Sequence, residues 1–394
     1  MLSLLLIIDS VNGFLMKSLH IYFPLSQIYK IVLQFLMLIY FFSLNSKKIL
    51  SFLILVLLLI IPVFFNFIVS NDEYNYLETI LQLDKFIYVI LAFFLINEVI
   101  KRYGETALIR IKKVININLL VLIANLIMGI LGFGHRQYKG GDIDIGTRGF
   151  FYAGNEMSGL ILVLFSASLY FLYSKKNKGK YVIVSLLYLT LAVFSSTKVA
   201  IVGVLISILI IPNIKDKSLV DSVKRLSLKW VMVLFVGFGL GAVIVKNVIY
   251  RTGLIERWSF FYEKFSDNII SFLLSGRNIT AKDQFRIFID EYNLFHWIFG
   301  IGSDNYRIVE MDFIDILINY GIYGIIVFYG FSTIVFFKMI MNSRIQNYRY
   351  SRLAVYLFTV LFFISTFTGH VIFSAMTGIF ISLIASLAFY KKIE

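Results

Sequence analysis

The sequence lacks cysteine entirely, and its 394 residues include only four histidines and three prolines. Without cysteine, the chain can form no disulfide bond and offers no thiolate for catalysis or metal binding. The histidines, at positions 20, 135, 296 and 370, include no pair at the HxxxH spacing of a helical zinc site. We therefore expect no metal centre and no cofactor.

Charged residues are scarce as well, at 15% of the chain, whereas 59% of the residues are hydrophobic. Apolar runs of about 20 residues recur along the whole length, which is typical of a polytopic helical membrane protein. The net charge of +14 comes from short basic clusters between these runs. Such clusters orient membrane helices, so we expect an all-α membrane bundle and no nucleic-acid partner.

About twelve membrane-spanning helices are predicted, and they form a single bundle over residues 1–394. The first starts apolar at Leu2 and has neither a basic segment nor a small-residue cleavage site, so we interpret it as a retained helix. Asp9 and Asn12 interrupt it, and a tight turn ending at Lys198 joins the seventh and eighth. The predicted spans lie near residues 2–19, 28–44, 49–69, 80–98, 114–132, 151–173, 181–196, 198–212, 229–249, 312–337, 353–369 and 371–389.

Lys and Arg residues in alternate loops orient the predicted bundle, because basic loops stay in the cytoplasm. The basic clusters lie at 47–48, 101–113, 175–180, 215–229, 338–352 and 391–392. The loops between them are acidic or mixed in charge. We therefore expect both termini in the cytoplasm, and the long loop 250–311, between spans nine and ten, outside.

The predicted outer loop carries aromatic residues at helical spacing. One series runs from Trp258 through Tyr262 to Leu273, and a second runs from Phe285 to Tyr292. Both patterns predict amphipathic helices. Such helices either lie on the membrane surface or cap a cavity between the spans, and the sequence leaves both placements open.

An acidic stretch leads from this loop into the tenth span. Glu310 stands eleven residues before Gly321, and eleven steps of 100° return to nearly the same face of a helix. We expect Gly321, with Gly324 near it, to let a neighbouring helix approach below Glu310. Glu310 is thus placed at the mouth of a membrane helix.

A second stripe on the same helix end consists of Asp312, Asp315 and Asn319. Its i, i+3, i+7 spacing extends roughly 10 Å along the helix. Acids at such a depth are costly, so they are usually retained for function. Glu310 and Asp312 have an alternative explanation, in which they are solvated acids favoured by the positive end of the helix dipole. Asp315 lies deeper along the helix, so this explanation fits it less well.

Four basic residues on the predicted outer side run against the usual bias of Lys and Arg toward the cytoplasm. They are Arg148, Arg277, Arg286 and Lys198. A guanidinium binds phosphate through two parallel hydrogen bonds, so these residues are candidates for a pyrophosphate site, with Asn155 in a supporting place. The alternative is ordinary pairing with acids in residues 142–156.

Together these features resemble the O-antigen polymerase and ligase superfamily. Ligases of that family carry His-Asn, nine residues and then Gly-x-x-Gly, to which Glu310-Met311 and Gly321-Ile322-Tyr323-Gly324 correspond. Polymerases carry Arg-x10-Gly motifs in outer loops, matched here by Arg148 and Gly159. The segments 275–277, 300–302 and 197–198 also resemble family positions. Glu310 stands where a ligase has its histidine, which favours a polymerase of the Wzy type, for O-antigen or capsule.

The resemblance implies a GT-C-like, inverting, metal-independent glycosyltransferase in the bacterial inner (plasma) membrane, with its active site on the outer face. The reaction implied moves a glycan from undecaprenyl pyrophosphate to a hydroxyl of a second lipid-linked repeat unit. Glu310 or Asp312 would act as the base, and the outer cations would stabilise the leaving group. The implied partners are the lipid-linked donor and acceptor, membrane lipid, a flippase and a chain-length regulator.

Two other functions stay open. One is an O-antigen ligase, which moves finished glycan to an acceptor. The other is a flippase for lipid-linked oligosaccharide, or another transporter. The sequence shows no internal repeat and no paired broken helices, which weakens the transporter hypothesis.

Overall fold

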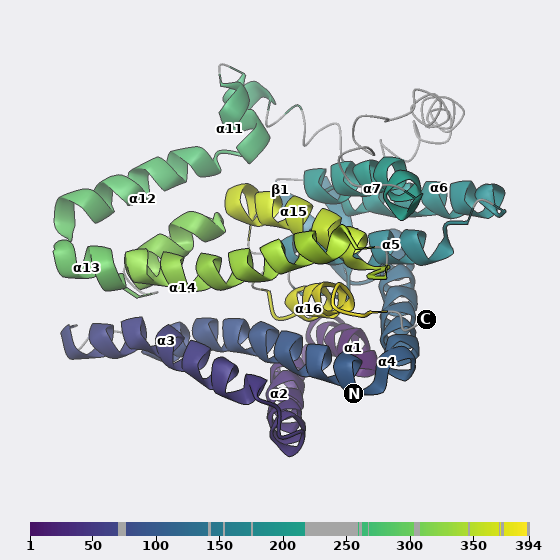
Figure 1. Cartoon of the computed structure of the whole chain (residues 1–394). Helices are drawn as coiled ribbons and strands as arrows, with labels where there is room; N and C mark the ends of the chain where they lie inside the picture. The colour runs from purple at the N-terminus through teal and green to yellow at the C-terminus, as the bar shows by residue number, and fades with distance from the viewer. Residues whose placement is uncertain are drawn as a thin grey trace.

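The computed structural model describes residues 1–69, 76–140, 143–152, 154–174, 176–216, 259, 262–266, 268–302, 308–345, 347–369, 371 and 374–391. Within these residues the regular structure is helical, apart from one antiparallel hairpin (Figure 1). The elements are η1 (Leu2–Leu4), α1 (Leu5–Ser18), α2 (Leu25–Ser43), α3 (Lys48–Val69), α4 (Tyr76–Ile130), β1 (His135–Gly140), β2 (Ile143–Gly149), α5 (Gly154–Leu172), α6 (Lys178–Ser195), α7 (Lys198–Asp216), α11 (Ile269–Leu274), α12 (Arg277–Glu291), α13 (Leu294–Phe299), α14 (Asp312–Ser343), α15 (Ser351–Thr368) and α16 (Gly378–Leu387).

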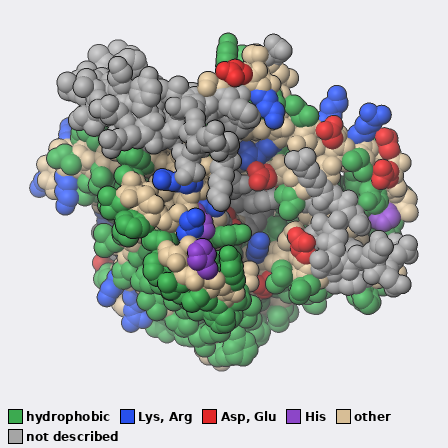
Figure 2. All heavy atoms as spheres, turned by 180° about the vertical axis from the view of Figure 1, so that it is seen from behind, with side chains coloured by type: hydrophobic (Ala, Val, Ile, Leu, Met, Phe, Trp, Pro, Cys, Tyr) green, Lys and Arg blue, Asp and Glu red, His purple; other side chains and the backbone are tan. Residues whose placement is uncertain are grey.

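Six helices in the described part of the chain are long and apolar enough to cross a membrane: α2, α3, α4, α6, α7 and α14. The apolar helices α5, α15 and α16 are shorter. Hydrophobic side chains cover a broad area of the face drawn in Figure 2, as a surface in contact with lipid requires. The chain is therefore an all-α protein of membrane character. The predicted span near 229–249 lies outside the described residues.

The helix α1 is shorter than the predicted first span, with 14 residues against the roughly 20 that a bilayer requires. Its start lies against Asn118, in the second half of α4. The Asn118 side chain accepts from the Leu6 amide at 3.1 Å and donates to the Leu2 carbonyl at 3.1 Å. The first of these bonds satisfies a backbone amide of the kind that the start of a helix leaves open, and the second ties the chain start to α4.

Two long helices contain a break. The predicted spans near 80–98 and 114–132 are the two parts of α4, which bends at Gly104, where φ is 48°. The helix α14 is interrupted at Gly321, where φ is 66°. Only glycine adopts such backbone angles without strain. The break at Gly321 therefore redirects a helix that hydropathy alone presents as uninterrupted, whereas hydropathy already divides α4 into two spans on either side of Gly104.

The described parts of the loops that hold the basic clusters gather at one end of the bundle, which we call the basic end. There Arg102 donates to the carbonyl of Leu44, which joins the bend in α4 to the turn between α2 and α3. Lys215 donates to the Tyr170 carbonyl at 2.8 Å, and the Tyr170 hydroxyl donates to the Arg349 carbonyl at 2.7 Å. The alternation of basic loops along the sequence thus corresponds to a single end of the folded chain.

The opposite end, which we call the site end, collects the hairpin, the turn between α6 and α7, the short helices α11 to α13 and the start of α14. The hairpin was not predicted. It is fixed by Asn125, whose side chain donates to the Arg148 carbonyl at 2.8 Å and accepts from the Phe150 amide at 2.8 Å. A Cβ at Gly149 would lie 2.3 Å from the Asn125 carbonyl oxygen, so the close approach requires glycine.

The short helices of the long loop pack against the bundle. Phe299 of α13 stacks on Phe65 of α3 with 4.3 Å between ring centroids, and Phe288 of α12 is buried with Ile318 of α14. Figure 1 shows α12 and α13 at one end of α3 and α14. The first predicted amphipathic helix is interrupted, because the side chain of Asn268 caps a new short helix, α11. Trp258 lies outside the described residues.

Candidate functional site

A polar cavity lies inside the site end. One part, of about 450 Å³, is lined by α1, α2, α4 and the start of α5. A second part, of about 150 Å³, lies between α4 and α14. Lys85 of α4 and Glu156 of α5 line both parts, so the two spaces are adjacent. Polar space enclosed by apolar helices is expensive to maintain, which marks it as a candidate site.

The acidic stripe predicted on α14 lines this cavity. Asp312, Asp315 and Asn319 all border the smaller part, and each is at least 97% buried. Asp312 accepts a short hydrogen bond from the Ser365 hydroxyl of α15. This bond fixes the Asp312 carboxylate at the edge of the cavity.

Asp315 has a structural role, because both oxygens of its carboxylate accept hydrogen bonds from backbone amides. One oxygen accepts from the Val309 amide at 2.9 Å and the other from the Met311 amide at 3.0 Å. These two amides flank Glu310, whose φ of 63° is in the left-handed region that residues with a side chain rarely enter. Asp315 therefore holds the backbone turn on which Glu310 stands.

Glu310 and Arg277, which are 33 positions apart, form an ion pair at the start of α14. Both the Nε and the Nη2 of Arg277 donate to the Oε2 of Glu310, at 3.1 and 2.5 Å. The Arg277 side chain is 19% exposed and that of Glu310 42%. The left-handed turn of Ser275 and Gly276 starts α12 at Arg277 and directs its first residue toward Glu310. Two of the predicted site residues are thus in direct contact.

Gly321 meets another segment of the long loop. A Cβ there would lie 2.2 Å from the carbonyl oxygen of Ile298, at the end of α13. The turn at 300–302 pairs with the same break, since the Ile301 amide donates to the Ile318 carbonyl at 2.8 Å. Glycine at 321 is required both by its positive φ and by this approach. The loop and the tenth predicted span are therefore joined at that point.

The helical arithmetic that placed Gly321 below Glu310 is wrong. The helix α14 begins at Asp312, so Glu310 is not on it, and the break at Gly321 changes the phase beyond that point. A Cβ at Gly324 would lie 2.3 Å from the Cβ of Tyr320 in the same helix. Gly324 thus accommodates the break itself, and no second helix approaches it closely.

Arg148 projects from the hairpin near the start of α5. Its guanidinium lies 5.9 Å from the ring centroid of Tyr152, which lines the larger part of the cavity. In the described part of the chain it has no acidic partner, and its Nε is buried without a hydrogen bond. Burial lowers the pKa of Arg148 from its ordinary value, and Tyr152 and Tyr138 oppose this shift. An anion bound here would accept a hydrogen bond from the Nε of Arg148 and balance its charge.

The remaining predicted residues lie elsewhere. Lys198 donates to the Phe272 carbonyl at 2.7 Å, which ties α11 to the start of α7. Arg286 is 83% exposed and pairs with Asp290 on the outer face of α12. Gly159 allows close packing, since a Cβ there would lie 2.3 Å from a methyl of Val371. The side chain of Asn155 lies outside the described part of the structure.

The sequence analysis missed the cations that line the cavity. Lys85 stands inside a predicted span, and no described residue forms an ion pair with its ammonium group. Lys30 of α2 also lines the cavity and pairs with the buried Asp9 at 2.9 Å. The sequence does carry an indication of these residues. An ammonium group within an apolar run is costly in a membrane, so a lysine at such a place is usually functional.

Aromatic rings often stack on sugar faces, and two aromatic residues of the long loop, Tyr262 and Trp297, differ in their surroundings. Tyr262 is 65% exposed. Trp297 packs against Phe285 and Phe288, with ring centroids 5.9 and 4.9 Å away, and belongs to the small core between α12 and α14. Trp297 therefore stabilises the fold of the loop, and this packing leaves less of its ring free to stack on a sugar.

Comparisons with protein-family models, with curated proteins and with solved structures found no match. The function is therefore inferred from the geometry of the site and from the sequence motifs.

Proposed function

We propose that the chain is a membrane glycosyltransferase that joins lipid-linked oligosaccharide repeat units into a surface polysaccharide, as a Wzy-type polymerase does. The observation that carries the proposal is the acid-and-cation arrangement at the site end: Asp312 and Lys85 line one cavity, and the Arg277–Glu310 pair stands where α14 begins. The motif spacings around Glu310 and Arg148 give independent support. In this proposal the basic end faces the cytoplasm.

The proposed reaction is a single inverting displacement on undecaprenyl pyrophosphate-linked glycan. A hydroxyl oxygen of the acceptor sugar attacks the anomeric carbon of the donor from the face opposite the pyrophosphate. The new C–O bond forms as the bond from the anomeric carbon to the pyrophosphate oxygen breaks, and undecaprenyl pyrophosphate leaves with the electron pair. The acceptor proton passes to a carboxylate, for which Asp312 is better placed than Glu310 because it lines the cavity.

Positive charge would stabilise the departing pyrophosphate. Arg148, close to the first residue of α5, offers a guanidinium beside the positive end of a helix dipole, which favours anions. Lys85, an exposed residue that lines the cavity, adds a second cation. Arg277 is oriented by Glu310, and the latter is thus assigned to positioning. The polyprenyl tail would remain in the membrane alongside the helices.

A set of single substitutions tests this assignment in a source strain from which the gene has been deleted. Asp312→Asn, Lys85→Gln and Arg277→Lys are expected to abolish the ladder of long glycans on a gel. Lys282→Gln, on the exposed face of α12, is the matched control and should restore the full ladder. Normal ladders from all three site variants would contradict the proposal. If single capped repeats also failed to reach their acceptor, a ligase would be favoured instead.

A transporter is the second candidate, favoured by one observation. The Asp9–Lys30 pair, whose carboxylate is buried, places charge between α1 and α2, as substrate pathways in membranes do. Release of labelled repeat units across a vesicle membrane, without any increase in their length, would identify transport. Growth of the repeat units in detergent solution, where no transmembrane gradient exists, would exclude it as the sole function.

A further inference from the structure

A second, larger groove lies on the flank of the bundle toward the basic end. It has a volume of about 870 Å³ and is bordered by α3, α4 and α14. Its walls are apolar for most of their length, and Ile54 of α3 and Ile326 and Ile334 of α14 stand exposed along it. The groove therefore opens sideways, toward the lipid of a surrounding membrane.

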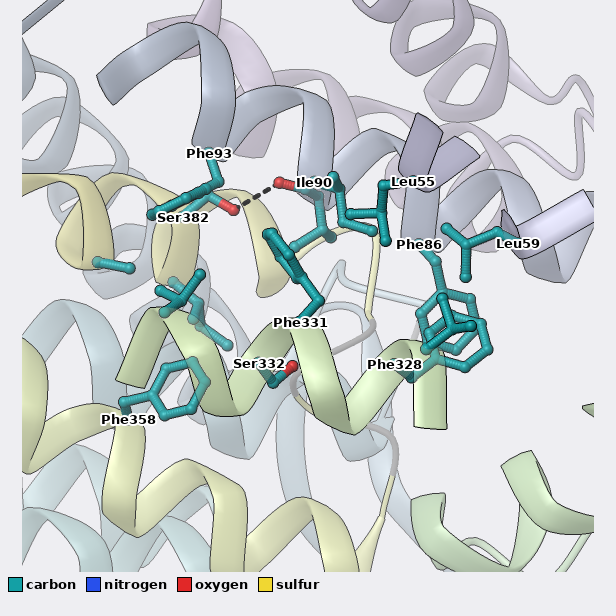
Figure 3. Close-up of a pocket in the computed structure, with 15 residues that line it drawn as sticks. Leu55, Leu59, Phe86, Ile90, Phe93, Phe328, Phe331, Ser332, Phe358 and Ser382 are labelled. Atoms are coloured by element: carbon teal, nitrogen blue, oxygen red, sulfur yellow. Dashed lines mark hydrogen bonds between the residues drawn. The ribbon is translucent and has the colours of Figure 1, made fainter. Parts of the chain in front are cut away.

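The inner wall of the groove is closed by aromatic packing. Figure 3 shows Phe93 of α4, Phe331 of α14 and Leu55 of α3 lining a smaller adjoining pocket, which shares these residues with the groove. Ser382 of α16 donates to the Val89 carbonyl at 2.8 Å behind them. Aromatic side chains thus form the inner wall of the groove.

Basic residues stand at the end of the groove near the basic end. Lys48 and Lys338 both line it, and Lys101 lies near enough to Lys48 for their charges to repel. The only acid among their partners in the described residues is Glu98, 3.7 Å from Lys48, and Glu98 is shared with Arg102 at 3.5 Å. The net charge at this end is therefore positive and lacks a complete set of counterions.

The length of the groove fits one leaflet. From Lys338 to Ile326 the α14 wall extends about 18 Å at 1.5 Å per residue, and half of a hydrocarbon core is about 15 Å. We infer that this groove binds one anionic diacyl glycerophospholipid of the leaflet at the basic end, its phosphate near Lys48 and Lys338 and an acyl chain along α14. Basic pockets between membrane helices bind anionic headgroups in this way. This site is separate from the proposed site of glycosyl transfer.

The chain offers two independent variants for a test. Lys48→Gln with Lys338→Gln removes the charge but leaves the apolar walls. Gly330→Leu fills the groove, since nothing lies within 4 Å of a Cβ at that position, and it leaves both lysines in place. Lys178→Gln, at the start of α6 and outside the groove, is the control.

The measurement is native mass spectrometry of the full chain in detergent, with equal amounts of dioleoylphosphatidylglycerol and dioleoylphosphatidylcholine. The unchanged protein and the control should retain one phosphatidylglycerol in preference to phosphatidylcholine. The double lysine variant should lose this preference by roughly tenfold, and Gly330→Leu should retain less of both lipids. Unchanged retention in Gly330→Leu would overturn the inference whether or not the lysine variant folds. Equal retention of the two lipids by the unchanged protein, or displacement of phosphatidylglycerol by equimolar undecaprenyl phosphate, would also overturn it.

Discussion

Asp315 is the side chain on which the geometry of the candidate site most depends. Its two oxygens bind the amides on either side of Glu310, and the carboxylate is 3% exposed. In Asp315→Asn the amide group keeps only one acceptor oxygen and turns an NH₂ toward a backbone N–H. We expect a loss of about 2–3 kcal/mol in the free energy of unfolding, measured by denaturant titration in detergent.

The control for this prediction is Asp290→Asn, which removes an exposed carboxylate from a surface pair with Arg286. A change below about 0.5 kcal/mol is expected there, because exposed ion pairs contribute little. Equal effects at Asp315 and Asp290 would show that the backbone hydrogen bonds do not hold the turn.

Glu310 and Asp312 are distinguished by what happens to turnover when each loses its charge. Asp312→Asn should lower the rate of chain extension by roughly a hundredfold or more, because it removes the proposed base. Glu310→Gln should lower it by only about tenfold, since Arg277 keeps its charge but loses its orientation. The rate is read from the incorporation of labelled repeat units. The reverse order of the two effects would assign the base to Glu310.

At the scale of single residues, the sequence identified Arg277 and Glu310 separately but not their contact. The 33 positions between them are spanned by a loop whose path no local pattern specifies. Lys85 was missed for a related reason, since it belongs to a helix predicted only as a span. The residues that line the cavity with it come from α5 and α14, which are distant in sequence, so its place in the cavity follows from packing alone.

At the scale of elements, the break in α14 separates the half that carries the acids from the half that lines the lipid groove. Gly321→Ala should cost at least about 2 kcal/mol of unfolding free energy, because the new methyl would meet the Ile298 carbonyl at a positive φ. Gly330→Ala, in the regular part of the same helix with open space around it, should instead stabilise by up to about 1 kcal/mol. Unfolding midpoints measured under identical conditions compare the two, and a stabilising Gly321→Ala would contradict the break.

Helices were predictable where hydropathy decides them, as for α3 and α7, because apolar length is a local property. The break at Gly321 was not, since a glycine inside an apolar run is compatible with an intact helix. The hairpin of β1 and β2 was also missed. Its strands carry charged and glycine residues in place of an alternating pattern, and Asn125 of α4 fixes it from outside.

At the scale of the whole molecule, the bundle has two chemically distinct ends. The basic loops meet at one, and the acids of α14, the hairpin and the polar cavity meet at the other. The alternation of charge along the sequence predicts that these two ends face opposite sides of a membrane. The account places glycosyl transfer at the site end and binding of an anionic lipid toward the basic end.

The most direct test of the central claim is chain extension by the purified protein. The full chain would be reconstituted in liposomes with lipid-linked repeat units isolated from the source strain, and the products would be separated on a gel and weighed by mass spectrometry. We predict a ladder whose masses rise by one repeat unit per step, formed without a transmembrane gradient and absent in Asp312→Asn. Repeat units recovered at their original length from the unchanged, folded protein would contradict the account.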